Sequence, residues 1–367
     1  RGVGLMVLVA ALVFTAVPAE AVDLTPATGK YRLNLDTTVS WGARYRVQDR
    51  DLAIISPFEG GTAWSVNGDD GNLNFEEGSL VSNTLKATVD LDFATQAGQH
   101  AFGFFARGSA FYDFALMNDC CERTELSDAA EDWAGSRVEL LDAYAWWQFP
   151  VGKGRGELRL GRQVLNWGES TFIPGGIGIT NPVDLSALRV PGAELKEAYR
   201  PVGMLWGSVD LSSQISVEAY YQFEWEETVV DPRGTYFSTN DFASRGGEYV
   251  FIGFATTPDT GLSPYPWYQG PTDRPLMGVP RGPDQNPDDG GQYGLALRWF
   301  VPSLGGTEFG FYFINYHSRL PTANGVSGSV EGAMAASEAG AAAALGVYTY
   351  FGVPPGVDPT VDAIAAQ

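Results

Sequence analysis

The feature that most constrains the fold of this chain is an unbroken alternation of side-chain type across residues 31–47. One set is Tyr31, Leu33, Leu35, Thr37, Val39, Trp41, Ala43, Tyr45 and Val47, and the residues between them are polar, charged or glycine. Successive side chains of a β-strand point to opposite faces, so the segment is predicted to be one strand with an apolar and a polar face. At about 3.3 Å per residue it would be on the order of 55 Å long, whereas strands of soluble proteins average about 5 to 6 residues. The pattern therefore favours a sheet larger than a soluble core requires.

The same alternation recurs in eight further segments, which makes nine predicted strands. Their apolar rows run from Leu85 to Phe93, Phe102 to Tyr112, Leu141 to Phe149, Leu158 to Leu160, Leu205 to Leu211, Ile215 to Trp225, Tyr293 to Val301 and Phe309 to Phe313. The connectors alternate between long and short: residues 50–79, 116–135, 163–197 and 229–290 are long, and 95–99, 151–156, 212–213 and 302–306 are short. Outer-membrane barrels have short periplasmic turns and long extracellular loops, whereas nothing requires a soluble β-sandwich to alternate its loop lengths. The sequence predicts an all-β, transmembrane antiparallel β-barrel.

The two ends of the chain lack the alternating pattern of its middle. Residues 1–21 carry an apolar run and the small-residue site Ala19-Glu20-Ala21, typical of a cleaved signal peptide; the alternative is a buried N-terminal helix. Beyond them no stretch approaches the roughly 20 apolar residues of a membrane helix. We assign residues 22–320 to the barrel and residues 321–367 to an Ala/Gly/Pro-rich extracellular loop or truncated end. Because nine is an odd number and no amphipathic strand follows, we expect the sequence to hold an incomplete barrel.

Composition excludes one class of partner. The chain carries 44 acidic and 23 basic residues, a net charge of −21, and such a surface repels nucleic acid. Aromatic residues make up 13%, with 10 Trp, which fits interfacial girdles around a barrel. Cys120 and Cys121 are the two cysteines, and as neighbours they cannot link distant parts of a fold. We expect an ordinary loop pair, with a vicinal disulfide as the alternative.

Candidate catalytic residues are few. His100 and His317 are the two histidines, and Ser318 beside the second would point to the opposite face of a strand, so the two cannot form a nucleophile and base. We expect no enzyme activity and no cofactor. The acidic clusters at 69–72 and 288–290 lack the spacing of a twelve-residue calcium loop, so we expect turns there and assign no metal site. Loose divalent binding at the lipopolysaccharide surface is the alternative.

Residues 161–197 form the most unusual connector of the chain, because they mix small apolar runs with Gly-Pro breaks and a few charges. This composition suits packing against protein, and irregular backbone at membrane depth is tolerated only where protein or a water-filled cavity surrounds it. We therefore expect the segment to fold into the lumen and constrict it; the alternative is an extracellular cap.

Charged side chains on the predicted polar faces are the candidates for lining a path through the barrel. They are Arg44, Arg46, Arg107, Glu218, Glu224 and Arg298 from the strands, and Arg162, Trp167, Glu169 and Arg189 from the in-folded segment. Facing charges of both signs would create a transverse field that orients polar solutes. The alternative is a set of structural ion pairs that hold the tilt of the strands.

Several motifs carry a resemblance to a known family. Residues 161–197, together with the runs at 70–75, 108–113 and 234–241, resemble a proteobacterial outer-membrane β-barrel family catalogued as a domain of unknown function. Its members are typically longer, and the Ala-rich end here departs from the family pattern. The resemblance implies that the gene lies near genes for exporters of the resistance-nodulation-division type. It also implies transport of hydrophobic compounds such as lipids or steroids. It assigns no substrate and no binding residue.

The function expected from these observations is an outer-membrane channel or transporter-like barrel for a hydrophobic or poorly soluble solute. Its partners would be outer-membrane lipid, lipopolysaccharide and an envelope export system. The alternative is a structural or adhesive barrel that acts through its long loops, residues 50–78 and 229–290. The aromatic run Tyr265-Pro266-Trp267-Tyr268 would then grip a surface partner.

Overall fold

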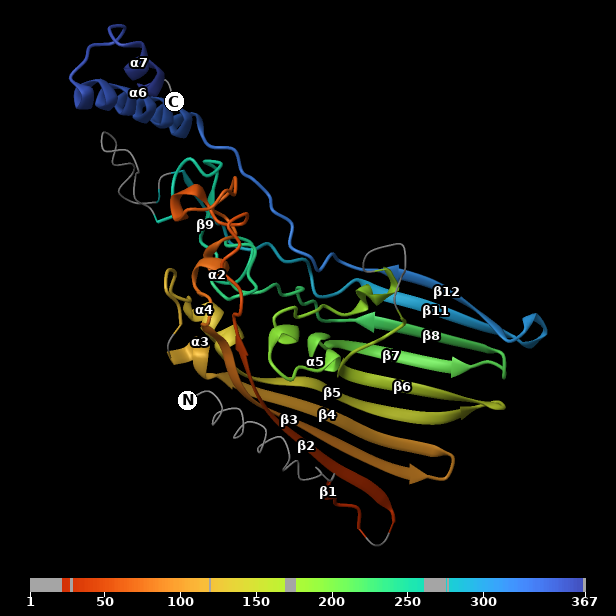
Figure 1. The fold of residues 1–367 in the computed structure, drawn as a ribbon. Coiled ribbons are helices and arrows are strands. Elements are labelled where there is room, and N and C mark those ends of the chain that lie inside the picture. Colours follow the sequence, from red (N-terminus) through yellow and green to blue (C-terminus); the bar gives the residue numbers. More distant parts are fainter. Residues whose placement is uncertain are drawn as a thin grey trace, which may run out of the picture.

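The computed structural model describes residues 22–26, 29–118, 120–168, 176–260, 275 and 277–365. The predicted signal peptide, residues 1–21, lies outside the described residues, as do Glu169 and the aromatic run 265–268. The described part is mostly β-structure, with several short helices and one longer helix toward the C-terminal end (Figure 1).

One antiparallel sheet of ten strands dominates the fold, and its strands follow one another in chain order. They are β1 (Val22–Asp23), β2 (Tyr31–Tyr45), β3 (Leu80–Ala97), β4 (His100–Asp113), β5 (Ser136–Val151), β6 (Gly154–Gln163), β7 (Val202–Asp210), β8 (Ile215–Gln222), β11 (Gln292–Val301) and β12 (Thr307–Asn315). Apart from the two-residue β1, these are the nine predicted strands, so the prediction of a large antiparallel sheet is confirmed. Within the described residues the sheet is open, with β1 at one edge and β12 at the other. A separate hairpin, β9 (Tyr249–Phe251) with β10 (Gly278–Pro280), lies in the loop after β8.

The register of the sheet aligns the apolar rows of consecutive strands. One line of directly opposed residues crosses eight strands through Leu33, Phe93, Phe104, Ala145, Leu160, Leu205, Tyr221 and Tyr293. Because the side-chain period of a strand is two, this register sends the charged residues of the strands to the opposite face. The exception is Arg162 of β6, which pairs with Ala143 and Gly203 of the apolar rows. We call the apolar side the outer face and the charged side the inner face.

One predicted row is wrong in part. A β-bulge between Ala106 and Gly108 inserts an extra residue into β5 opposite Arg107, and a bulge shifts the alternation that follows it by one position. Leu141, placed by the sequence in the outer row, is therefore buried on the inner face, at 3% exposed. Its neighbour Leu140 takes the outer position, at 57% exposed.

All long connectors gather at one end of the sheet and all short turns at the other (Figure 1), because consecutive antiparallel strands alternate in direction. The long connectors carry the short helices η1 (Pro57–Glu59), α2 (Asp70–Leu73), α3 (Phe114–Asn118), α4 (Asp128–Ala130), the π-helical turn η2 (Glu131–Gly135), η3 (Gly176–Thr180), η4 (Ala187–Arg189) and α5 (Leu195–Ala198); η5 (Pro302–Leu304) lies in a short turn. None of the described helices is long and apolar enough to cross a membrane.

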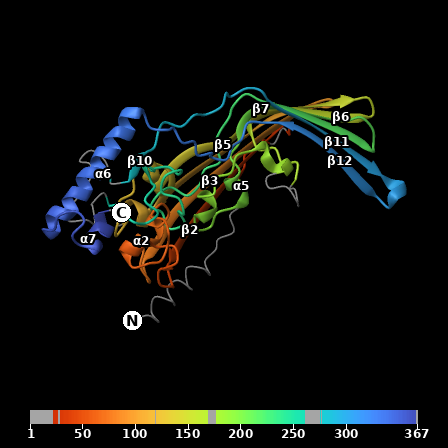
Figure 2. The same cartoon turned by 90° about the horizontal axis from the view of Figure 1, so that it is seen from above.

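The chain beyond β12 contains two helices that the sequence analysis did not predict, α6 (Val330–Phe351) and α7 (Pro359–Ala365). They stand beyond the loop end of the sheet (Figures 1 and 2), and the Tyr348 hydroxyl donates to Asp362 at 2.8 Å between them. Ser329 caps the first turn of α6 through the Gly332 amide, and Gly352 ends the helix in a left-handed conformation. The signal was present, because alanine is the strongest helix former and residues 333–344 are rich in it.

Candidate functional site

The connector between β6 and β7 lies against the inner face of the sheet, on its concave side (Figure 2). The Gln222 amide donates to the Thr180 carbonyl at 2.6 Å, and Arg44 of β2 donates to the Arg189 carbonyl at 2.6 Å. A Cβ added to Gly42 of β2 would lie 2.5 Å from the Pro191 side chain, so glycine permits this close approach. The described part of the segment thus packs against the sheet, as its composition predicts.

A buried ion pair anchors the end of this segment to β3. Lys86 Nζ lies 2.5 Å from Glu197 Oε2, and both side chains are less than one-tenth exposed. Lys86 also donates to the Gly192 carbonyl at 3.0 Å, and Glu197 accepts from the Thr88 hydroxyl at 3.2 Å. Glu197 further receives the Glu194 amide as part of a capping box on α5.

A chain of ion pairs links the start of β5 to the end of β6 and the loop after β8, at the loop end of the sheet. Arg137 contacts Asp184 and Glu139, each at 3.0 Å. Arg200 then joins Glu139, at 3.2 Å, to Glu226, at 2.7 Å. Two predicted candidates meet here, because Arg162 binds Glu224 at 2.7 Å, and Arg162 also binds Glu226 at 2.7 Å. Arg162 lies in β6 and not, as predicted, in the in-folded segment.

A second group of predicted residues meets on Glu218 of β8. Trp167 donates its indole N–H to Glu218 Oε2 at 2.8 Å, and Arg298 donates to Oε1 at 2.6 Å. The Trp167 ring lies against Tyr220 and Tyr312, with centroids 5.2 and 5.7 Å away. These residues belong to the main apolar cluster of the inner face, so Trp167 is both a packing residue and a hydrogen-bond donor.

A cavity of about 70 Å³ lies where the inner face meets the long loops. Arg44 and Arg189 both lie over the ring of Phe237, at 5.0 and 4.6 Å from its centroid. Burial raises the pKa of Asp231 on the cavity wall, and the nearby Arg189 partly opposes this. The other lining residues are mainly aromatic, apolar or ion-paired and include Val81, Lys86, Phe111, Leu116, Trp133, Arg137, Leu141, Tyr236 and Glu197.

Two predicted candidates have other partners. Arg46 lies beyond the end of β2 and donates to the backbone carbonyls of Gln48, Asp49, Asn72 and Phe75, so it holds the following loop in shape. Arg107 binds Asp90 through two hydrogen bonds, at 2.6 and 2.8 Å, and contacts Asp142 at 3.5 Å. Glu169 lies outside the described residues.

Sequence reasoning missed Arg137, Arg200 and Trp133, although both arginines belong to the chain of ion pairs and lie against the Trp133 ring. The guanidinium carbons of Arg137, Arg200 and Arg245 lie 4.2, 4.9 and 3.9 Å from the Trp133 ring centroid, and such contacts stabilise a desolvated cation. A signal existed for Arg137: residues 137–140 alternate, but out of phase with residues 143–149. That change of phase marks the bulge.

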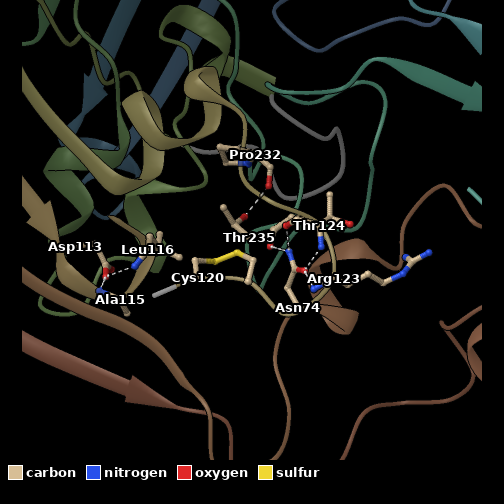
Figure 3. The surroundings of a disulfide bond; sticks show 11 residues. Asn74, Asp113, Ala115, Leu116, Cys120, Arg123, Thr124, Pro232 and Thr235 are labelled. Carbon is tan, nitrogen blue, oxygen red and sulfur yellow. Dashed lines mark hydrogen bonds between the residues drawn. A yellow bond between two sulfur atoms is a disulfide. The ribbon is translucent and has the colours of Figure 1, made fainter. Parts of the chain in front are cut away.

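The long loops form one packed assembly around Asn74, which is 2% exposed. Its side-chain oxygen accepts the backbone N–H groups of Arg123 and Thr124, at 3.1 and 2.8 Å, and its amide donates to the carbonyls of Thr124 and Gly234, each at 2.9 Å (Figure 3). Cys120 and Cys121 form a vicinal disulfide just before this clamp, which was the alternative to an ordinary loop pair.

The fold and the inner-face site define a class: a large antiparallel sheet with one apolar face and one charged face that its own chain covers. The chain belongs to the family described as "Protein of unknown function (DUF1302)", whose model matches residues 3–358. Searches of curated proteins and of solved structures find no significant match.

Proposed function

We propose that this protein forms the wall of an outer-membrane β-barrel that passes a hydrophobic or poorly soluble solute. The observation that supports the proposal is the exposure of aromatic side chains on the outer face. Twelve aromatic side chains on it are between 36% and 59% exposed: Trp41, Phe102, Phe104, Tyr112, Trp147, Tyr221, Phe223, Tyr293, Trp299, Phe309, Phe311 and Phe313.

The area of this face favours contact with lipid over contact with water. At roughly 40% of the 150–250 Å² of a whole aromatic side chain, each ring exposes about 80 Å². Twelve rings alone then expose on the order of 1,000 Å², whereas the largest apolar patch of a soluble monomer is about 300–600 Å². Contact with lipid is the environment in which such a face is stable.

Aromatic contacts cluster beside the short turns of the sheet. Phe102 stacks on Trp147 of the next strand at 6.1 Å, and Trp147 contacts Phe149 at 4.5 Å. Trp299 contacts Phe309 across another short turn at 5.9 Å. A band of rings at one end of the strands is the pattern of an interfacial girdle, and it supports a periplasmic position for the short turns.

The inner face provides a path that suits an amphipathic solute. The walls of the cavity offer apolar contact through the aromatic side chains of Phe111, Trp133 and Phe237. The charges around them are neutralised in ion pairs. A solute can pass the connector between β6 and β7 only if this connector moves or leaves a gap beside the sheet. We place an envelope export system at the periplasmic end, with lipid and lipopolysaccharide around the outside.

Replacing residues 168–192 with a short Gly-Ser linker tests the role of the inner segment. We expect higher single-channel conductance in planar bilayers, because the described part of this segment lies against the inner face and is then removed. Deleting the exposed loop residues 282–286, which belong to the loop after β8, is the matched control and should leave conductance unchanged. Equal conductance for wild type and the inner deletion would contradict the constriction.

The packed loop assembly favours a second candidate, a structural or adhesive barrel. Loops that serve only as covers need no such order, yet Asn74 makes four side-chain hydrogen bonds there. Liposome swelling separates the two functions. Solute flux that persists after loop trimming supports the channel, whereas a tight barrel that loses only surface attachment supports adhesion.

A further inference from the structure

The long loops bring together three buried carboxylates from two distant parts of the chain. Asp69 and Asp70 lie at the start of α2, in the loop after β2, and Asp241 lies in the loop after β8. One oxygen from each lies within 4.8 Å of the others. They are 1%, 0% and 5% exposed, respectively.

The hydrogen-bond partners of these carboxylates are unequally distributed. Asp70 is fully engaged, because it accepts from Arg233 at 2.7 Å, from the Thr124 hydroxyl at 2.8 Å and from Arg123 at 3.2 Å. Asp69 uses one oxygen to accept the Ser56 backbone N–H at 2.9 Å. Within the described part of the chain, the other oxygen of Asp69 and both oxygens of Asp241 have no hydrogen-bond partner.

The surrounding charges do not compensate this cluster. Arg123 and Arg233 face it, and Arg123 also binds Asp259 and Glu59. Two guanidinium groups therefore face five carboxyl groups. Buried carboxylates without a partner are strongly unfavourable.

The spacing of the carboxylate oxygens fits a cation that prefers oxygen ligands. Calcium binds six to eight oxygens at about 2.3–2.6 Å, so two ligands of one ion lie at most about 5 Å apart. The two loops also approach each other closely beside the cluster. A Cβ added to Gly68 would lie 2.6 Å from the Thr239 carbonyl oxygen, so only glycine permits this approach.

We propose that Asp69, Asp70 and Asp241 bind one calcium ion, which ties the loop after β2 to the loop after β8. The site does not depend on whether the barrel conducts a solute. The local spacing of residues 69–72 predicts only a turn, because the third carboxylate comes from the loop after β8 and reaches the site through the fold.

Calcium titration of the full chain tests this site. The protein is refolded in detergent without lipopolysaccharide, treated with EDTA, dialysed and titrated with calcium chloride in a calorimeter. We expect one ion per chain, with a dissociation constant of about 10⁻⁴ to 10⁻³ M, the range of extracellular calcium modules. Asp241→Asn and Asp69→Asn should each weaken binding at least tenfold. The control Asp288→Asn, in the exposed acidic turn of another part of the chain, should change it less than twofold.

Three results would overturn the proposal. They are the absence of stoichiometric binding by the wild type, binding that Asp288→Asn weakens as much as Asp241→Asn does, and binding that persists unchanged in both Asn variants at the site. Circular dichroism checks that each variant is folded. Should Asp241→Asn not fold, Asp69→Asn and the wild-type stoichiometry still decide the outcome.

Discussion

The ion pair between Lys86 and Glu197 allows a direct test of how the inner segment is held. It joins β3 to α5 at 2.5 Å, with side chains 7% and 9% exposed. Replacing Lys86 with Met leaves a buried carboxylate with only the Thr88 hydroxyl and the Glu194 amide as donors. Replacing Glu197 with Gln leaves a buried ammonium beside neutral acceptors.

The magnitude follows from the desolvation of the two charges. Removing one partner of a buried pair costs about 3–5 kcal/mol, whereas replacing both is often close to neutral. We expect each single variant to lose about 3 kcal/mol or more, and Lys86→Met/Glu197→Gln to lose about 1–2 kcal/mol, because the double variant buries no unpaired charge. Since about 1.4 kcal/mol corresponds to a factor of ten, detachment of the segment should become at least about a hundredfold more frequent in each single variant.

Two measurements check this double-mutant cycle. Guanidinium unfolding in detergent gives the free energies, and the rate of trypsin cleavage after Arg189 reports detachment of the segment. Asp284→Asn, which removes an exposed pair with Arg281, is the control and should cost less than about 1 kcal/mol. Additive losses in the double variant, or single losses as small as that of the control, would refute the reasoning.

Three further predictions concern the loops. Asn74→Ala should cost about 2–4 kcal/mol in urea unfolding, because it leaves buried backbone groups unpaired; a loss below about 0.5 kcal/mol would contradict the clamp. Because burial raises the pKa of Asp231 above 3.8, its stabilising effect is complete below pH 3.8 and is lost as pH rises through the raised pKa. Asp231→Asn should therefore flatten the fall in stability above pH 3.8, and an unchanged slope would argue against it. Replacing Cys120 and Cys121 with Ser should lower stability by only about 1 kcal/mol, because the closed ring is very small; a large drop in the thermal midpoint would show otherwise.

The strands could be read from the sequence because their signal is local. Every long strand of the sheet coincides with a segment of alternating side chains, and Tyr31–Tyr45 is the clearest. The alternation also separates the faces, since the period of two is a property of the strand itself. It fails at Leu141, where the extra residue in β5 is defined only by the pairing with β4.

The inner site was only partly predictable. The polar rows correctly put Glu218 and Arg298 on one face, but the partners of these residues depend on register and on the path of the inner segment. The pairing of Glu218 with both Trp167 and Arg298 spans three parts of the chain. No local pattern contains that information.

The sequence by itself determined the strands, the apolar and charged sides of the sheet and the alternation of long and short connectors. These depend on the residues within each segment and on the covalent order of the chain. The tertiary structure alone decided which charges meet: that the inner segment is anchored through Glu197, and that Asp241 joins Asp69 and Asp70. The physical reason is that electrostatic contacts depend on distance in space, and the fold brings together residues that the chain holds far apart.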